Sequence, residues 1–303
     1  MAETGIAAPF ETGTMIKAQK INPAMQRGMA LVVVLWVVAL LGVIATGHIS
    51  NAHTTTLLAA RQVEQARLRA AANAGLQRAI IELLAQGAPD PWPVNGSEQL
   101  INIRDHEVSV AIRSASGLLD LNNARRQLLS AALQPAMPEQ ASREALAAAI
   151  LDWRDQDNLV RLNGAEAATY SAKQLGWTIR NGPFATVDEL RYVFGMTDEV
   201  FAQLAPLLTV HSGRSGVDIE YAPAALVQAL TGEELAARNP TAAGQTRRSA
   251  RAGAFHITIR ATSATAASVA TLAAVVRIAP TADEPFTILH WQEPVRTLPD
   301  ASD

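Results

Sequence analysis

The hydrophobic pattern of the chain begins with a long apolar run near the N-terminus. Residues 29–47 form nineteen consecutive positions without a charged side chain. At about 1.5 Å per helical residue, this length approaches the roughly 30 Å hydrocarbon core of a bilayer. Lys17, Lys20 and Arg27 precede the run, whereas the next charge after it is Arg61. The pattern predicts a single membrane-spanning helix with a cytoplasmic N-terminus and an exported remainder.

The helical pattern continues beyond the apolar run. Residues 48–86 contain no proline and only one glycine. Apolar side chains there follow the spacing of one helix face, at Leu76, Ile80, Leu83 and Leu84. We therefore expect one helix over residues 29–86. A cleaved signal peptide is the alternative, but the apolar run is longer than a usual signal core and lacks a small-x-small cleavage site at its end.

Alternation of apolar and polar residues predicts a sheet whose strands are separated in sequence. The alternating segments are His106–Ser116, Phe255–Ala261, Val269–Ala279 and Phe286–Trp291. Prolines and a glycine in residues 89–96 predict a loop before the first of them. Residues 122–209 have the pattern of successive helices. The expected fold class is thus α+β, an antiparallel sheet interrupted by a large all-helical insertion.

Composition and charge exclude several classes of function. The 25 Lys and Arg residues against 28 Asp and Glu give a net charge of -3, which offers no electrostatic attraction for nucleic acid. The absence of cysteine excludes disulfides, thiolate zinc sites and cysteine nucleophiles. The six histidines are scattered, and residues 114–117 (SASG) do not form a nucleophile elbow. The sequence therefore predicts a protein that is not an enzyme.

Acidic residues in the middle of the chain are candidate metal ligands. Asp152, Asp155, Asp157 and Glu166 could converge as hard oxygen donors, which suit calcium better than zinc. Asp155, Asp157 and Glu166 are the expected ligand set. Their spacing is not that of an EF-hand, and helix caps or surface carboxylates are the alternative interpretation.

A second candidate site follows the acidic segment. Residues 182–197 suggest a helix-hairpin-helix, a motif whose backbone amides often hold a DNA phosphate. Residues 195–197 are Gly-Met-Thr where Gly-hydrophobic-Gly is usual. The surrounding acids would repel phosphate: Asp188, Glu189, Asp198 and Glu199. The alternative is that the hairpin is a compact packing unit.

The N-terminal sequence QRGMALVVVLWVVALLGVIATG, Gln26–Gly47, resembles the class III signal of type IV pilins and pseudopilins. The resemblance implies cleavage between Gly28 and Met29 by a prepilin peptidase and methylation of the new amino group. Family members usually have phenylalanine first and glutamate fifth in the mature chain, where this sequence has Met29 and Val33. The K-type minor pseudopilin of type II secretion systems characteristically lacks that glutamate. Since the glutamate is thought to neutralise a neighbour's amino terminus in hydrocarbon, Val33 suits a tip subunit with no neighbour above it.

Further segments resemble K-type pseudopilins in the same order. They are LLDLNNA (Leu118–Ala124), ILDWRDQDNLVRLNGAEAATY (Ile150–Tyr170), GPFATVDELRYVFGMTDEVFAQLAPLLTV (Gly182–Val210) and VDIEYAPAALVQAL (Val217–Leu230). The chain departs from the family at Ala167 and Ala168, where further acids are common, and at residues 218–221, where an Asn-Val-Asn-Thr type run is common. The resemblance covers Gln26 to about Trp291.

The resemblance implies a pilin-like fold with the following parts. They are a leader peptide (1–28), an N-terminal helix (29–86, transmembrane over 29–47), a first part of the pilin-like domain (87–117), an inserted helical domain (118–210) and a second part of the pilin-like domain (211–303). Met1, Met15 and Met25 are all plausible translation starts.

The implied function is that of a minor pseudopilin in the bacterial inner membrane, with its C-terminal domain in the periplasm. It would lie at the tip of the type II secretion pseudopilus, initiate assembly and support export across the outer membrane. Expected partners are minor pseudopilins of the I, J and H types, prepilin peptidase, exoproteins and the outer-membrane secretin, with calcium as cofactor and no nucleic acid. A subunit of a type IV pilus or DNA-uptake system is the close alternative, and a peripheral anchored binding module the distant one.

Overall fold

The computed structural model describes residues 23–85, 89–230, 252–263, 268–280 and 282–293. Within the first helix, side chains are described at residues 30–43, 56 and 58–84. The chain divides into two compact units, residues 1–63 and 64–303. Most of the expected leader, residues 1–22, lies outside the described residues, as does the side chain of Met29.

The N-terminal helix α1 covers Pro23–Leu84, so the helix expected over residues 29–86 is present and begins earlier. The first unit contains this helix up to Val63. Its side chains from residue 30 to 43 are exposed, including Trp36 at 74%. In the part of the chain that the structure describes, no helix is both long and apolar enough to cross a membrane. The span expected over residues 29–47 extends past the described side chains and stays a prediction.

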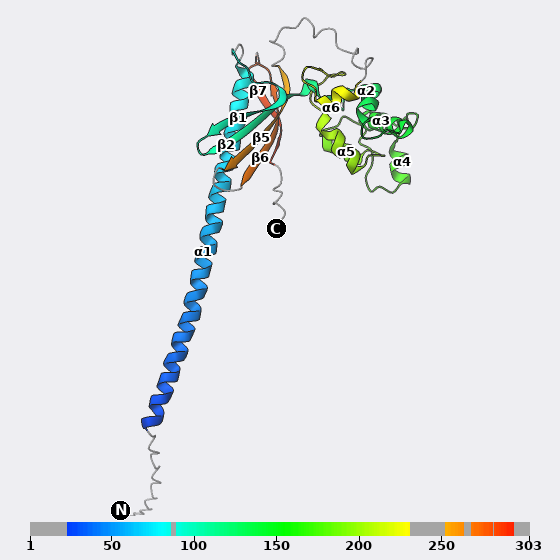
Figure 1. The fold of residues 1–303 in the computed structure, drawn as a ribbon. Coiled ribbons are helices and arrows are strands. Elements are labelled where there is room, and N and C mark those ends of the chain that lie inside the picture. The colour runs from blue at the N-terminus through cyan, green and yellow to red at the C-terminus, as the bar shows by residue number, and fades with distance from the viewer. Residues whose placement is uncertain (1–22, 86–88, 231–251, 264–267, 281, 294–303) are drawn as a thin grey trace, which may run out of the picture. The chain divides into compact units, whose positions relative to one another are not determined.

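The second unit contains a five-stranded sheet in the order β1-β2-β5-β6-β7, with all neighbouring strands antiparallel (Figure 1). The strands are β1 (Asn95–Ile103), β2 (His106–Ser114), β5 (Gly253–Ser263), β6 (Val269–Ile278) and β7 (Phe286–Gln292). The antiparallel sheet and its interruption in sequence are confirmed, because β2 pairs with β5. The four alternating segments correspond to β2, β5, β6 and β7.

Strand β1 was not expected, and it begins inside the predicted loop over residues 89–96. It forms a hairpin with β2 through the turn at residues 104–105, where Arg104 has φ of 54°. As an edge strand it has one neighbour and none of its side chains is fully buried. Its sequence therefore lacks the strict alternation that a strand with one buried face shows.

Helix α1 packs on one face of the sheet in the second unit. Leu68, Leu76 and Ile80 from the helix are buried against the apolar residues of the inner sheet face. These are Val108, Val110, Ile112, Phe255, Ile257, Ile259, Ala261, Leu272, Ala274, Val276 and Ile278. The expected helix stripe is confirmed, with Leu84 partly buried at its end.

Gly75 marks the closest approach of α1 to the sheet. A Cβ at this position would lie 3.0 Å from Ile259 Cγ2 and 3.0 Å from Val108 Cγ1. Interiors are packed as densely as organic crystals, so little space is available for a larger side chain. The helix can lie this close to the sheet because its contact face carries small residues here, including Ala72 and Ala79.

We expect Gly75→Leu to lower the free energy of unfolding by about 2–3 kcal/mol through overpacking against β2 and β5. Ala74→Leu is the matched control, because Ala74 is exposed on the neighbouring helix position. Chemical unfolding of the full chain in detergent measures both. Equal stability of the two variants would contradict this account of the helix–sheet contact.

The insertion forms a second core built from helices. Its elements are α2 (Arg126–Leu133), α3 (Gln140–Arg154), α4 (Ala167–Ala172), α5 (Asp198–Leu204) and α6 (Ala224–Ala229), with 3-10 turns η1 (Ala115–Gly117), η2 (Val187–Tyr192) and η3 (Ala205–Leu207). The helical character expected for almost all of residues 122–209 is confirmed in part, because residues 155–166 and 173–186 are loops between these helices. Leu226 and Leu230, beyond the boundary predicted at residue 210, belong to the same buried core as Leu119. No residue of this core belongs to the core between α1 and the sheet.

Two short strands join the ends of the insertion. β3 (Leu119–Asp120) pairs in parallel with β4 (Leu208–Thr209).

The fully buried Asp120 accepts hydrogen bonds on Oδ1 from the backbone N of Asn122 (2.8 Å) and Asn123 (3.2 Å). Its Oδ2 accepts from Ser212 Oγ (3.0 Å) and Gly213 N (2.8 Å) on the returning segment. One carboxylate therefore connects the departing and returning chains, which we call the neck.

Histidines lie where the returning chain meets the outer face of the sheet. The Thr209 hydroxyl and His256 Nε2 share a 2.9 Å hydrogen bond, and the His211 and His256 rings are 6.4 Å apart. A cavity of about 310 Å³ lies at this junction, and His211, His256 and His290 on β7 are among the residues that line it. Burial, and then the positive potential of His211, Arg113 and His290, lowers the pKa of His256 to about 4. The neutral imidazole is thus the form that fits this junction.

Acidification should weaken the fold through His256. An unfolded histidine has a pKa of about 6.5, so the unfolded state takes up the proton first as the pH falls. His256 therefore carries no penalty above about pH 6.5 and opposes folding progressively down to about pH 4, by roughly 3 kcal/mol in total. We expect His256→Gln to reduce this pH dependence in thermal unfolding, and the exposed His290→Gln to retain it. An unchanged pH profile in His256→Gln would contradict the assignment.

Candidate functional site

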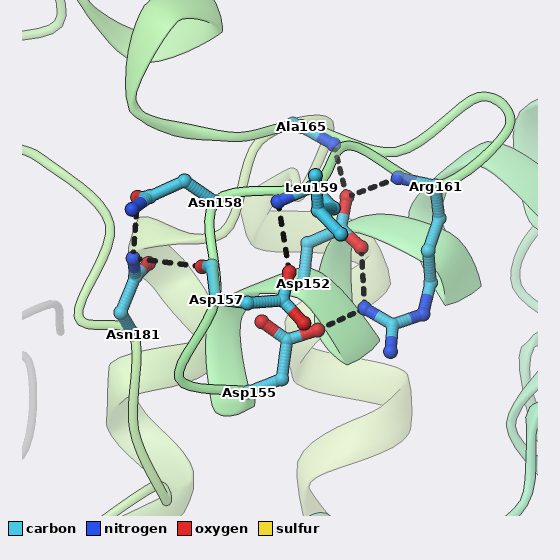
Figure 2. A network of polar contacts seen from close by, with 8 residues as sticks. All are labelled: Asp152, Asp155, Asp157, Asn158, Leu159, Arg161, Ala165 and Asn181. Atoms are coloured by element: carbon cyan, nitrogen blue, oxygen red, sulfur yellow. Dashed lines mark hydrogen bonds and ion pairs between the residues drawn. The ribbon is translucent and has the colours of Figure 1, made fainter.

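Asp152 lies in the last turn of α3 and holds the loop that follows (Figure 2). The helix buries Leu146, Ile150 and Trp153 in the insertion core, and Asp152 is 0% exposed beside them. Its Oδ2 accepts from the backbone N of Ala165 (2.9 Å) and Arg161 (3.3 Å), and its Oδ1 accepts from Arg161 Nη1 (2.8 Å). This carboxylate is therefore fully satisfied and fixes residues 161–165 against α3.

Glycine is required at position 164 because the loop passes directly over Asp152. A Cβ there would clash with Asp152 Oδ2. The backbone turns here through a hydrogen bond from Gly164 N to the Arg161 carbonyl (2.7 Å), and Asn163 has φ of 66°. The sequence RLNG thus gives the local turn that brings the loop back to the helix.

Arg161 contacts a second carboxylate. Its Nη1 also donates to Asp155 Oδ2, so one guanidinium nitrogen bridges Asp152 and Asp155. Figure 2 shows both carboxylates pointing toward this nitrogen. The hydrogen bonds to Asp152 and Asp155 raise the pKa of Arg161 above its ordinary value. Arg161 was not among the residues expected at the site. The sequence feature that could have indicated it is its place between Asp157 and Glu166, as a basic residue in an acidic segment.

Glu166 completes the acidic cluster from the N-terminal end of α4. Its side chain is buried, with the residue 5% exposed, and neither carboxylate oxygen has a hydrogen-bond partner among the described residues. Asp155 Oδ1 is likewise buried without one. Burial, and then the negative charges of Asp152 and Asp155, raises the pKa of Glu166. A buried anionic oxygen without a partner is costly, so this arrangement favours a bound cation.

The cluster offers the ligand chemistry of a hard cation. Asp152, Asp155 and Glu166 each present one oxygen, and these atoms all lie within 4.8 Å of one another. The set contains only carboxylates, which suits calcium better than zinc. When all three carboxylates are ionised, the single positive charge of the bridging Arg161 does not balance them, and the cluster is negatively charged. The donor set therefore fits a calcium ion.

The structure brings together two of the three expected ligands, Asp155 and Glu166, with Asp152 as the third member of the cluster. Asp157 lies outside this group. Its side chain is exposed, and its Oδ1 accepts from the backbone N of Leu159 (2.8 Å), which forms an Asx turn. From the sequence, Asp152 could equally have faced solvent beside Trp153, so neither its burial nor its contacts with the loop were predicted.

A rigid aromatic platform supports the cluster. The rings of Trp153 and Phe184 stack 6.0 Å apart at 20°. The fully buried Tyr170 accepts a 2.9 Å hydrogen bond from Phe194 N, and burial raises its pKa to about 12. The acidic loop lies above this platform with exposed apolar side chains at Leu159 and Leu162. The loop also contributes to this core, because Ala165 is fully buried in it.

The hairpin over residues 182–197 forms from η2 and the start of α5. Gly195 has φ of 87°, and the Thr197 hydroxyl accepts from Val200 N to cap α5. Arg180 pairs with Glu189, and Arg191 pairs with Asp198. Its apolar residues belong to the insertion core: Leu190, Val193 and Phe201. These contacts describe a packing unit whose positive groups are already matched with acids.

The remaining expected positions lie in α1. Val33 is exposed on this helix. Gly28 and Met29 are helical, and the side chain of Met29 lies outside the described residues. The expected processing site and tip position therefore stay predictions.

Comparison with known proteins supports one family. Residues 103–213 match a family model described as Type II secretion system (T2SS), protein K. Type II secretion system protein K of Klebsiella pneumoniae is 28% identical over 202 residues, which cover 60% of this chain and 61% of that protein. The protein of the same name from Pectobacterium carotovorum subsp. carotovorum is 26% identical over 202 residues, covering 60% and 62%. The match thus spans about three fifths of the length of these curated relatives.

A solved structure has a similar fold. It is a chain of the GspK-GspI-GspJ complex from the enterotoxigenic Escherichia coli Type 2 Secretion System, with a TM-score of 0.55 and 17% identity. The similarity covers 78% of this chain and 98% of that chain. The family-model match includes the neck and the acidic loop. In agreement with the resemblance seen in its sequence, the part of this chain over residues 103–213 is similar to the type II secretion system protein K family.

Proposed function

We propose that this chain is a minor pseudopilin of a type II secretion system, anchored in the bacterial inner membrane with a cytoplasmic N-terminus and a periplasmic sheet and insertion. The observation that carries the proposal is the match of residues 103–213 to the protein K family, supported by the fold shared with a chain of the GspK-GspI-GspJ complex. Its role is assembly rather than catalysis. It acts at the tip of the pseudopilus, initiates assembly and supports export across the outer membrane.

The character of α1 supports membrane anchoring. Fourteen successive side chains, residues 30–43, are exposed, and none of them is charged. Exposed apolar surface of this extent requires cover by lipid or by other apolar helices. Val33 supports the tip position, since an unpaired glutamate in hydrocarbon would be costly for a subunit with no neighbour above it.

The proposed partners follow from the relative's assembly. The solved relative is part of a complex with GspI and GspJ, so we propose minor pseudopilins of the I and J types as direct partners, and the H type as a further one. Prepilin peptidase processes the N-terminus. Exoproteins and the outer-membrane secretin are the proposed contacts of the exported part.

The first test of the proposal is N-terminal processing. When the full chain is expressed with a prepilin peptidase, we expect intact-mass and N-terminal peptide analysis to show a start at Met29, with the apolar helix retained. Gly28→Leu is the matched control and should remain uncut. A start after residue 47, or the same start without the peptidase, would contradict the pseudopilin assignment.

Co-purification separates the secretion system from its close alternative. We expect the full chain to co-purify with minor pseudopilins of the I and J types from detergent-solubilised membranes. Salt-sensitive DNA binding without that co-purification would instead indicate a DNA-uptake system.

We further propose that the acidic cluster binds calcium. Asp152, Asp155 and Glu166 are the residues that would hold the ion, and the supporting observation is the pair of buried Glu166 oxygens without partners. Bound calcium would neutralise the cluster and connect the end of α3 to the start of α4. Its role would be structural, fixing the loop between these helices.

Calcium should raise the melting temperature of the full chain in detergent. At a concentration about 10 to 100 times the Kd, we expect a stabilisation of roughly 1–3 kcal/mol. Glu166→Gln should abolish the response, while raising stability in chelator by about 1–2 kcal/mol because a buried charge is removed. Asp157→Asn is the matched control and should respond like the unmodified chain. Loss of the response in Asp157→Asn but not in Glu166→Gln would place the ion elsewhere.

A further inference from the structure

We infer that Arg161 is a built-in competitor of the divalent cation at the acidic cluster, so that calcium and the Arg161 guanidinium hold Asp155 in turn. Two of the three carboxylates that could hold the ion are the two that Arg161 bridges through a single nitrogen. This inference rests on the proposed calcium site, and it assigns to Arg161 a control over the affinity of that site.

The two cations cannot share the bridged carboxylates. All three donor oxygens lie within 4.8 Å of one another. An ion in oxygen contact at about 2.3–2.6 Å would therefore be within a few Å of the bridging nitrogen. Repulsion between like charges at such a distance is large in a site with little water. Occupation by calcium thus requires the guanidinium to withdraw.

Asp155 is the carboxylate that changes partner. Asp152 has three donors, two of which are backbone N–H groups of the loop. Among the residues that the structure describes, the Arg161 side chain alone donates to Asp155 Oδ2, and Asp155 Oδ1 is buried without a partner. Calcium can therefore take Asp155 and Glu166 without dismantling the contacts that hold the loop to α3.

The Arg161 side chain can leave while its backbone stays in place. The Arg161 N–H donates to Asp152 Oδ2, and its carbonyl accepts from Gly164 N. The side chain is 39% exposed, so the route to solvent is open. Without calcium, the guanidinium provides the counter-charge that the buried Asp152 needs.

The test is calcium titration of the full chain in detergent by calorimetry, together with thermal unfolding in chelator and in calcium. We expect Arg161→Gln to bind calcium at least about tenfold more tightly than the unmodified chain, because a competing unit charge is removed. In chelator the variant should melt at a lower temperature, and calcium should restore most of the loss. If Arg161 had only a structural role, Arg161→Gln would lower the melting temperature by the same amount in chelator and in calcium.

Two further variants define the comparison. Arg180→Gln removes the same charge from an arginine that pairs with Glu189 outside the cluster, and it should bind calcium as the unmodified chain does. Arg161→Lys keeps the charge without the planar fork that bridges two carboxylates, and it should bind with intermediate affinity. It also provides the test if Arg161→Gln does not fold.

The possible outcomes separate this inference from the calcium proposal. Tighter binding by Arg161→Gln, with calcium restoring its melting temperature, supports the competition. Equal or weaker binding by that variant, when the unmodified chain binds calcium, overturns the competition alone. No binding by either protein overturns both the calcium site and the competition, while the pseudopilin assignment is decided separately by N-terminal processing.

Discussion

The structure depends on bringing the two ends of the insertion to one point. The chain leaves the sheet at Ser114 and returns at Phe255, and these residues are partners in the pairing of β2 with β5. Asp120 meets this constraint, because its two carboxylate oxygens accept donors from the departing and the returning segments. Separating those segments would leave a fully buried carboxylate without half of its partners, which is strongly destabilising.

This constraint explains why the molecule has two cores rather than one. The core between α1 and the sheet and the core of the insertion share no residue. Between them lie polar contacts, such as the Thr209–His256 hydrogen bond, and a cavity. Because hydrogen bonds are directional, such contacts can orient the insertion on the sheet without a large apolar interface between the two. The insertion can thus have its own core while the inner face of the sheet packs against α1.

Much of the fold could be predicted from the sequence because its periodicity is local. The helix stripe at Leu76 and Ile80 and the alternation in β2 are set by burial on one face, so the pattern is visible in the residues themselves. Edge strand β1 buries its inner face only partly, through Ile101 and Ile103, and it pairs with β2 alone. Strands β3 and β4 have two residues each, so they carry no periodicity at all.

The acidic site was predictable in its chemistry but not in its geometry. Residue types indicated hard oxygen donors, and Asp155 and Glu166 do converge. Sequence spacing could not show that Asp157 turns outward to its own backbone. Nor could it show that Arg161 folds back across the cluster, because this depends on the turn before Gly164.

The contrast between Asp152 and Glu166 shows what such a site can change. Both are buried, but Asp152 has donors for each oxygen whereas Glu166 has none among the described residues. A change of cation at the cluster would therefore act first on Glu166 and on Asp155 Oδ1, the buried oxygens that have no partner among the described residues. The aromatic platform beneath, including Trp153, packs through contacts that do not involve the cluster. Exchange of one cation for another would consequently leave both this packing and the backbone contacts of Asp152 with the loop in place.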